Sequence, residues 1–468
     1  MDVIVIGAGP TGLMLAYELA LGGARTVVVE ELEERVRQVK GGTVQPRTAE
    51  LLDARGLLDA VRAHALPRAE VGGHFGGLPV SLDCAPWHTR TPYPISVPQW
   101  RIEEALEAAA VERGVEVLRG RPVTAVAADG DGVTVTAGGT ELRAAYAVAC
   151  DGAHSTVRGL LGVPFPGRPG TARAALADIR LSAVSDLVPT ELGHFSDLTR
   201  EANGYWGLLV PVGDLAYRFT FGTAEGAAEP TEEGVRAALT ALYGDGTRLA
   251  EIRTASTFSD AARQLERYRH GRVLFAGDAA HIHPPYGGQG LNLGVQDAVN
   301  LGWKLAATVA GWAPGGLLDT YEAERHPMAA RVLHHTAAQR VLAFPDPGMD
   351  MVALREIVTD LLRLPDANRY MAGMMSGLDA AGRLPDADLV TAAGPTRPAE
   401  LLRTGRGLLI DVGGGTDLPP GWADRVDVAH AKEGADMGTA LVRPDATVCW
   451  PGAGTLEDAL TATFGPPA

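Results

Sequence analysis

The sequence predicts an α/β protein in which a buried parallel sheet is joined to a second, mostly antiparallel sheet. Residues 2–6 and 25–30 are runs of β-branched residues, typical of strands buried on both faces, and residues 10–22 between them have helical spacing. This order is a βαβ unit. Residues 166–270 contain short alternating strands, and residues 272–276 return to a buried strand.

Helical spacing and short apolar runs predict the remaining elements. Helices are expected at 47–65, 100–113, 231–243, 289–312, 317–341, 350–375 and 455–463. Strands are expected at three places between 115 and 137, and at 142–150, 408–411 and 440–442. Residues 384–397 are rich in proline and glycine and are expected to form a linker.

Composition excludes several classes of protein. The 468 residues include 41 Lys and Arg against 57 Asp and Glu, a net charge of −16. Such a surface repels phosphate backbones, so nucleic acid and anionic membranes are poor candidate partners. Glycines and Glu18 interrupt the apolar residues at 3–30, so no membrane span is expected. Cys84, Cys150 and Cys449 are too dispersed for a disulfide framework or a zinc site, which favours the cytoplasm.

A glycine-rich motif lies between the first strand and the first helix. Its residues are Gly7-Ala8-Gly9-Pro10-Thr11-Gly12. The first glycine permits a tight turn, the second lets backbone amides approach a pyrophosphate, and the third allows the helix to pack closely on the strand. Glu30 ends the next strand, where a carboxylate can hold ribose hydroxyls. A loop with only a packing role would not account for Glu30, so the motif predicts a dinucleotide site.

Two further motifs follow buried strands. Asp151-Gly152 ends the strand at 142–150, and Ser155 can cap the next helix, although a plain strand–turn–helix would look the same. Asp278 follows the strand at 272–276, so its carboxylate is expected in the crevice at the carboxyl end of the sheet. The glycines at 287, 288 and 290 clear space for a flat ligand before a helix whose first amides favour negative charge. His281 and His283 lack further ligands at metal-binding spacing, so no metal is predicted.

These motifs resemble those of the class A flavoprotein monooxygenases, which have the para-hydroxybenzoate hydroxylase fold. The resemblance is closest to actinomycete hydroxylases of aromatic polyketides and to rifampicin monooxygenase. It extends over nearly the whole chain and includes Val97-Pro98-Gln99, residues 101–106, 300–306 and 318–327. It implies a Rossmann-type FAD-binding domain with an inserted antiparallel substrate domain, long helices and a thioredoxin-like C-terminal domain. The implied boundaries are 1–73, 97–165 and 270–340 for FAD, 74–96 and 166–269 for substrate, 341–385 for a helical connection, and 393–468 for the C-terminal domain.

The resemblance implies bound FAD, with NAD(P)H and O2 as co-substrates. Reduced flavin would form a C4a-hydroperoxide that transfers oxygen to an electron-rich aromatic carbon. Asp151 and Arg158 would also support a transient nicotinamide cofactor. Pro284, Pro285 and Gly288 would lie at the flavin face where oxygen reacts, and no acid or base is assigned. The residues implied to bind FAD are Gly7, Gly9, Pro10, Thr11, Gly12, Glu30, Arg47, Gln99, Arg101, Asp151, Asp278, Gly288, Gln289, Gly290, Leu291 and Asn292.

The implied substrate is a small aromatic molecule, a polycyclic polyketide or a related natural product, that contacts the region 166–270. Candidate wall residues are His194, Phe195, Tyr205, Trp206, Phe219 and Tyr286. Core packing is the alternative for each of them. Baeyer–Villiger oxidation, antibiotic inactivation and drug binding without turnover remain alternative functions on the same scaffold. The expected assembly is a monomer or a homodimer.

Overall fold

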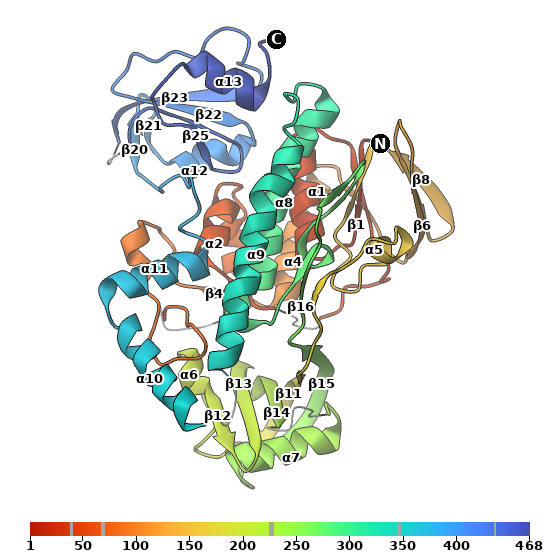
Figure 1. Ribbon diagram of the computed structural model, residues 1–468, viewed down its shortest axis with the longest axis vertical. Helices are drawn as coiled ribbons and strands as arrows, with labels where there is room; N and C mark the ends of the chain where they lie inside the picture. Colours follow the sequence, from red (N-terminus) through yellow and green to blue (C-terminus); the bar gives the residue numbers. More distant parts are fainter. Residues whose placement is uncertain (38–40, 67–70, 224–228, 344–347, 435–436) are drawn as a thin grey trace.

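The computed structural model describes residues 1–37, 41–66, 71–223, 229–343, 348–434 and 437–468. Among these residues, six strands form a central sheet that is parallel except at one edge and lies at mid-height in Figure 1. In spatial order they are β17 (Arg269–His270), β18 (Val273–Phe275), β9 (Tyr146–Ala149), β1 (Val3–Ile6), β2 (Thr26–Val29) and β5 (Glu116–Leu118). The predicted βαβ unit is confirmed, because α1 (Pro10–Leu21) joins β1 to its parallel neighbour β2.

Long helices cover the central sheet. The helix α8 (Gln289–Ala310) packs against α1, which also contacts α4 (Gln99–Glu112). The helix α9 (Asp319–Leu342) runs beside α8 (Figure 1). The carboxyl ends of β1 and β18 lead into the two glycine-containing motifs, which brings residues 7–12 and 277–278 to the same edge of the sheet.

A five-stranded antiparallel sheet forms the end of the molecule drawn lowest in Figure 1, as the sequence predicts. Its spatial order is β12 (Thr199–Ala202), β13 (Tyr205–Gly213), β14 (Ala216–Thr223), β11 (Arg173–Ala183) and β15 (Arg248–Ser259). The helix α7 (Glu232–Tyr243) covers the face that points away from the central sheet (Figure 1). Alternate residues such as Ala177 and Phe219 pair across β11 and β14 and form a core with Leu239 of α7.

In the described part of the chain, short strands form three further small sheets. The strands β10 (Gly167–Arg168), β16 (Ala262–Gln264) and β19 (His281–Ile282) form one sheet, β6 (Val123–Ala128), β7 (Val133–Ala137) and β8 (Thr140–Ala144) form another, and β3 (Thr43–Val44) pairs with β4 (Ile95–Ser96). The single strand predicted at 142–150 is therefore two strands. It divides at Ala145 because β8 belongs to the small antiparallel sheet and β9 to the central sheet.

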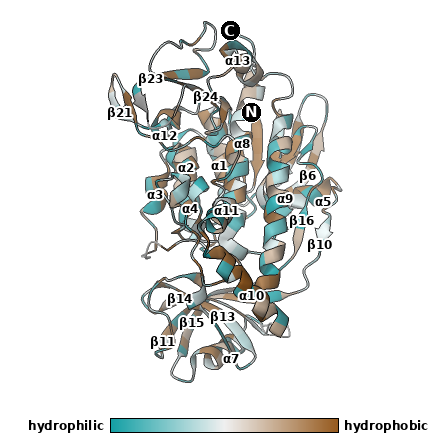
Figure 2. Ribbon diagram, turned by 60° about the vertical axis from the view of Figure 1, so that its left-hand side comes forward, coloured by the Kyte–Doolittle hydropathy of each residue, from teal (hydrophilic) through white to brown (hydrophobic). Residues whose placement is uncertain are grey.

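Two predicted helices are each divided in two. Residues 47–65 form α2 (Pro46–Asp53) and α3 (Leu58–Arg62), separated by Gly56 with φ of +69°. Residues 350–375 form α10 (Met349–Leu362) and α11 (Pro365–Ser376) because Pro365 cannot donate the amide that a continuous helix needs. The short helices α5 (Thr156–Leu160), α6 (Phe195–Leu198) and α12 (Pro398–Leu401) lie elsewhere in the chain. Figure 2 shows α10 as a mainly apolar helix beside the antiparallel sheet.

The tail forms a separate mixed sheet at the top of Figure 1. In its described part the order is β21 (Gly394–Thr396), β20 (Leu389–Thr391), β23 (Val426–Gly434), β22 (Gly407–Val412), β24 (Ala440–Val442) and β25 (Val448–Trp450), with α13 (Leu456–Phe464) packed against it. The expected linker at 384–397 is wrong, because β20 and β21 lie within it and pair with each other as a hairpin. The expected strands at 408–411 and 440–442 are confirmed as β22 and β24.

Buried charges attach this C-terminal domain to the central helices. Arg55 follows α2 and pairs with Glu18 of α1 at 2.7 Å between Nε and Oε1, with each side chain 1% exposed. The Nη2 atom of Arg55 also donates to the carbonyl of Pro444, at 2.7 Å. On the opposite side of this contact, Arg443 pairs with Glu324 of α9 at 2.7 Å. These contacts hold the C-terminal domain against α9 and against Arg55, which follows α2.

Candidate functional site

The first glycine-rich loop closes tightly and leaves one open position. A Cβ atom on Gly7, whose φ is +105°, would lie 2.5 Å from the carbonyl oxygen of Cys150. A Cβ atom on Gly12 would lie 2.0 Å from the carbonyl oxygen of Gly7. By contrast, no atom lies within 4 Å of a Cβ atom placed on Gly9, and no side chain caps α1. The space before the first turn of α1 is therefore free for a phosphate group.

Glu30 is fixed beside this loop. Its Oε2 atom accepts a hydrogen bond from the amide of Ala8 at 2.7 Å, and its Oε1 atom accepts one from the amide of Leu32 at 3.0 Å. The carboxylate thus lies at the end of β2, next to the turn that follows β1. This is the placement that recognition of a ribose requires.

Thr11 joins the first loop to the Gly277–Asp278 loop. Its Oγ1 atom would lie 2.6 Å from a Cβ atom on Gly277 and 2.2 Å from one on Gly294 of α8. Only glycine at both positions allows this close approach. Asp278 lies in a short 3-10 turn, Gly277–Ala279, at the carboxyl end of β18. Pro10, predicted with Thr11 as a cofactor residue, is the first residue of α1.

Asp151 holds the start of α5 in the second motif, and Arg158 reaches from there to the Gly277 loop. The Oδ2 atom of Asp151 accepts a hydrogen bond from the amide of Val157 at 3.0 Å, and burial raises the pKa of this carboxyl. The Nη1 atom of Arg158 donates to the carbonyl of Ala279 at 3.1 Å. Both residues therefore brace the fold at the cofactor edge, while their contact with a nicotinamide stays a prediction.

A fully buried charge network lies beneath the same loop, and sequence reasoning missed it. Asp297 of α8 accepts from Nε2 of His281 at 2.7 Å and from Nε of Arg325 at 2.7 Å. It also accepts from the amide of Gly277 at 3.2 Å. Burial would raise the pKa of Asp297, but the charge of Arg325 and the hydrogen bonds outweigh burial and lower it. The only sequence signal was a carboxylate within a buried helix.

The loop before α8 is held by side-chain amides. Gly287 and Gly288 have φ of +74° and +62°. Asn292 accepts from the amide of Gln45 at 2.7 Å and donates to the carbonyls of Thr43 and Gly288 at 2.8 and 2.7 Å. Gln289 donates to the carbonyl of Met375 at 2.7 Å. Because these side chains hold the loop, it is the backbone of residues 288–291 that remains to face a ligand.

Gln99, Arg101 and Arg47 differ in where they lie. Gln99 begins α4, and its Oε1 atom would lie 3.1 Å from a Cβ atom on Gly41. Arg101 pairs with Glu104 at 2.8 Å and lies over the ring of Trp100. Arg47, in contrast, is buried, and its Nη2 atom donates to the carbonyls of Asp445 and Ala446 at 3.3 and 3.2 Å. These bonds attach Arg47 to the C-terminal domain, and its contact with FAD stays a prediction.

The turn expected at the flavin face joins β19 to α8. Pro284 is buried and Pro285 is exposed. Tyr286 is partly buried, and burial raises the pKa of its hydroxyl. This hydroxyl lies near the ion cluster in which Asp260 pairs with Arg168 at 2.9 Å. The turn therefore lies between the short sheet β10–β16–β19 and the start of α8.

Alternation along the strands places some of the expected substrate residues in the core under α7 and others on the opposite face of the sheet. Phe219 is fully buried in the core under α7, and Tyr205 packs against the same core. Core packing, the alternative for each aromatic residue, therefore describes Phe219. Trp206 follows Tyr205 along β13 and so lies on the opposite face, which points toward the central sheet. It packs over Gly222, whose Cβ position is 2.6 Å from its ring nitrogen.

The same face of the sheet carries polar side chains that sequence reasoning missed. Arg218 donates to Asp178 at 2.8 Å, and the hydroxyl of Thr254 donates to the same carboxylate at 3.0 Å. These residues lie on three neighbouring strands that are far apart in sequence. Of the remaining candidates, His194 is buried at the start of α6, and Phe195 stacks on His74 with ring centroids 4.1 Å apart.

Comparison with known families decides the assignment. Residues 1–336 match the family described as "FAD binding domain", and residues 380–467 match "Aromatic-ring hydroxylase, C-terminal". The chain belongs to the FAD-dependent aromatic-ring hydroxylases. This hydroxylase is 47% identical to a 12-dehydrotetracycline 5-monooxygenase/anhydrotetracycline 6-monooxygenase of Streptomyces rimosus, over 100% of this chain and 99% of that protein.

Two further relatives agree with the family. A rifampicin monooxygenase of Streptomyces venezuelae is 43% identical over 96% of this chain and 95% of its own length. The solved structure of the OxyS anhydrotetracycline hydroxylase from Streptomyces rimosus matches with a TM-score of 0.89 and 46% identity, over 100% of this chain and 99% of that chain. The predicted family and α/β fold class are confirmed.

FAD is the cofactor of this hydroxylase, and NAD(P)H and O2 are its co-substrates, as is usual for the class. The residues present fit FAD. Space is open before α1 at Gly9, Glu30 stands beside that opening, and the left-handed Gly288 leaves the start of α8 without a side-chain cap. FAD supplies hydride acceptance and activation of O2 when it is bound.

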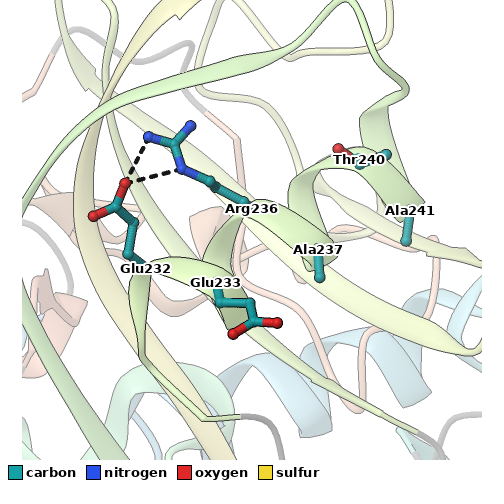
Figure 3. Close-up of a pocket in the computed structure, with 6 residues that line it drawn as sticks. All are labelled: Glu232, Glu233, Arg236, Ala237, Thr240 and Ala241. Carbon is teal, nitrogen blue, oxygen red and sulfur yellow. Dashed lines mark hydrogen bonds and ion pairs between the residues drawn. The ribbon is translucent and has the colours of Figure 1, made fainter.

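One further depression lies on the helix α7. Figure 3 shows a shallow depression on α7 where Glu232 and Arg236 form an exposed ion pair at 2.7 Å. It lies on the helix that covers the face of the antiparallel sheet directed away from the cofactor loops. Within the described ranges, no three His, Cys, Asp or Glu side chains are grouped as metal ligands would be. No helix among the described residues is both long and apolar enough to cross a membrane.

Proposed function

We propose that this monooxygenase hydroxylates a polycyclic aromatic polyketide of the anhydrotetracycline type. The observation that carries the proposal is the likeness over the full chain to tetracycline monooxygenases, at 47% identity. The reaction consumes the substrate, O2, NAD(P)H and a proton, and yields the hydroxylated product, water and NAD(P)⁺. Because NAD(P)H is consumed, we place the enzyme in the cytoplasm, as a monomer or a homodimer.

For FAD, we propose that the loop at residues 7–12 holds the pyrophosphate and Glu30 the adenosine ribose. Gln99, Arg101 and Asp278 would lie along the rest of the cofactor chain, and the backbone of residues 288–291 would meet the flavin. The boundaries expected for the FAD-binding and substrate-binding domains remain part of this proposal. The C-terminal domain, expected at 393–468, is extended to include β20.

For the substrate, we propose the face of the antiparallel sheet that carries Trp206. This face also bears Leu208 and Val210 by strand alternation, so it presents apolar surface to a flat ring system. The group of Asp178, Arg218 and Thr254 supplies polar anchors on the same face. Sites of this kind combine apolar walls with a few placed polar groups. Their task is to orient the ring and exclude water while the cofactor chemistry proceeds.

The mainly apolar helix α10 lies next to this sheet. Its exposed side chains favour the proposal that the substrate is apolar. Its outer residues Ile357 and Leu361 are 58% and 50% exposed, and Leu364 directly after it is 55% exposed. Exposed apolar side chains of this number on one helix are unusual for a protein surface without a ligand or partner. A large polycyclic molecule would reduce their contact with water.

The test is a substrate screen with NAD(P)H consumption as the first signal. Anhydrotetracycline should accelerate NAD(P)H oxidation and give a product heavier by one oxygen atom, with a new hydroxyl in its NMR spectrum. Rifampicin in the same assay tests the second candidate, which the 43% identical rifampicin monooxygenase favours. A ring-expanded product would identify Baeyer–Villiger chemistry. Tight binding without NAD(P)H consumption by either compound would contradict the proposal and favour drug binding without turnover.

A further inference from the structure

His283 lies between β19 and the turn at Pro284, and its protonation state follows from its contacts. Its Nδ1 atom is 2.8 Å from the carbonyl oxygen of Pro284. A carbonyl can only accept, so Nδ1 carries the hydrogen and Nε2 presents its lone pair. Burial lowers the pKa of His283 to about 4, which keeps the ring neutral near pH 7. His283 is therefore a fixed hydrogen-bond acceptor.

This acceptor is buried and has no hydrogen-bond partner among the described residues. A buried polar atom without a partner is costly, so such atoms are rare in native proteins unless a ligand or water pairs with them. The Nε2 atom lies close to Gly290, in the first turn of α8. The position of a Cβ atom on Gly290 lies 3.8 Å from Nε2 of His283 and 3.8 Å from Oδ1 of Asp278. The absent side chain thus leaves a gap with an acceptor on either side.

The chemistry of the gap selects the part of FAD that can enter it. The unpaired acceptor Nε2 of His283 requires a donor, and the carboxylate of Asp278 beside it repels a phosphate. The flavin ring offers isolated N–H groups at its edge. The ribityl chain offers successive hydroxyl groups, each of which can donate to one acceptor and accept from a backbone amide of α8.

We propose that Nε2 of His283 accepts a hydrogen bond from a ribityl hydroxyl of FAD, in the gap that Gly290 leaves beside Asp278. This inference rests on the assignment of FAD as the cofactor and adds a binding residue to it. His283 thereby fixes the rotation of the ribityl chain, and with it the position of the flavin above the turn at Pro284 and Pro285.

His335 offers a matched control. It is also buried, and its pKa is lowered to about 3 by burial and by the nearby His283. Its Nδ1 atom accepts from Nε2 of Gln339 at 3.2 Å, so its unpaired Nε2 atom carries a hydrogen. Replacing His335 removes a buried neutral ring of the same size near the same turn, but the acceptor it removes, Nδ1, is already paired with Gln339 and none of its unpaired atoms is an acceptor.

The test measures FAD affinity in apoprotein by titration of flavin fluorescence. His283→Leu should weaken FAD binding about tenfold, which corresponds to about 1.4 kcal/mol. His283→Gln, whose Oε1 atom can accept, should recover most of this loss, and His335→Leu should stay within about twofold of the parent. A set of FAD analogues, each lacking one ribityl hydroxyl, identifies the hydroxyl that is bound. The parent should bind one analogue about tenfold more weakly than it binds FAD. His283→Leu should bind that analogue as tightly as the parent binds it.

Several outcomes would overturn the proposal. The first is that His283→Leu binds FAD as tightly as the parent does. The second is that His335→Leu loses as much affinity for FAD as His283→Leu does. The third is that His283→Leu loses affinity, relative to the parent, by the same factor for FAD and for every analogue. If His283→Leu does not fold, the affinities of the parent for the analogues are sufficient as a test. A parent that binds every analogue as tightly as FAD contradicts the contact. A parent that binds no FAD would instead contradict the cofactor assignment itself.

Discussion

Replacing Asp297 by asparagine should destabilise the protein by about 3–5 kcal/mol, because the change leaves a buried arginine without its counter-charge. The Asp297 side chain is fully buried, and that of its partner Arg325 is 10% exposed. Asparagine keeps the size of aspartate but brings a donor where His281 and Arg325 already donate. It also weakens the hydrogen bond that holds the amide of Gly277.

Thermal unfolding followed by circular dichroism measures this effect. With an unfolding entropy of roughly 2.1 cal/mol/K per residue over 468 residues, a loss of this size should lower the midpoint by about 3–5 °C. Asp319→Asn is the matched control, because Asp319 forms a 2.6 Å ion pair with Arg269 while 69% exposed. An exposed pair of this kind contributes little, so the midpoint should change by less than about 2 °C. Equal shifts in Asp297→Asn and Asp319→Asn would refute the argument from burial.

The same carboxylate predicts a dependence of stability on pH. Because the pKa of Asp297 is lower in the folded protein than in the unfolded chain, its contribution is present above the unfolded value and is lost as pH falls through the folded value. The parent should therefore lose stability below about pH 4, and Asp297→Asn should lose less over the same range. Parallel pH profiles for the two proteins would contradict this assignment.

Further predictions address the cofactor, the substrate and the tail. Asp278→Ala should weaken FAD binding about tenfold or more in a flavin titration, because a hydrogen bond to a charged group is lost. Trp206→Ala and Tyr286→Ala should each raise the amount of hydrogen peroxide formed per NAD(P)H consumed in the presence of substrate. Tyr205 lies on the opposite face of the sheet, so Tyr205→Ala should mainly lower the midpoint of thermal unfolding. Cys449→Ser should leave the hydroxylation rate unchanged, because burial raises the pKa of this thiol to about 11 and keeps it protonated; a rate loss at unchanged flavin content would contradict this.

Local patterns predicted the central fold because its determinants are local. The buried run at 2–6, the glycines at 7–12 and the helix after them are set by residues adjacent in sequence. The errors arose where tertiary context divides an element. Ala145 separates two strands that belong to different sheets, and β20 and β21 are strands because β23 supplies a pairing edge. The local sequence does not show with which distant strand each of these segments pairs.

The site was predictable where backbone conformation dictates the residue type. Gly7 and Gly288 have left-handed conformations that a turn beside a ligand requires, and such glycines are visible in a sequence. Roles set by distant partners were not visible. Arg218 and Asp178 are 40 residues apart and meet only through the register of β11 and β14. The direction of Trp206 likewise depends on which face α7 covers, which alternation alone leaves undecided.

The contacts of the tail argue that the C-terminal domain acts as a structural support and not as a redox module. Its one cysteine, Cys449, is largely buried, its thiol donates to the carbonyl of Leu441 at 3.3 Å, and dithiol chemistry needs a second sulfur within reach. The buried arginines at its boundary act differently. The side chains of Arg47 and Arg55 extend from the central domain to the tail and donate hydrogen bonds to the backbone carbonyls of residues 444–446. The tail therefore supplies acceptors for two guanidinium groups that are buried in the central domain. Removing the tail would leave both guanidinium groups without these acceptors, which makes the central domain dependent on the tail for its stability.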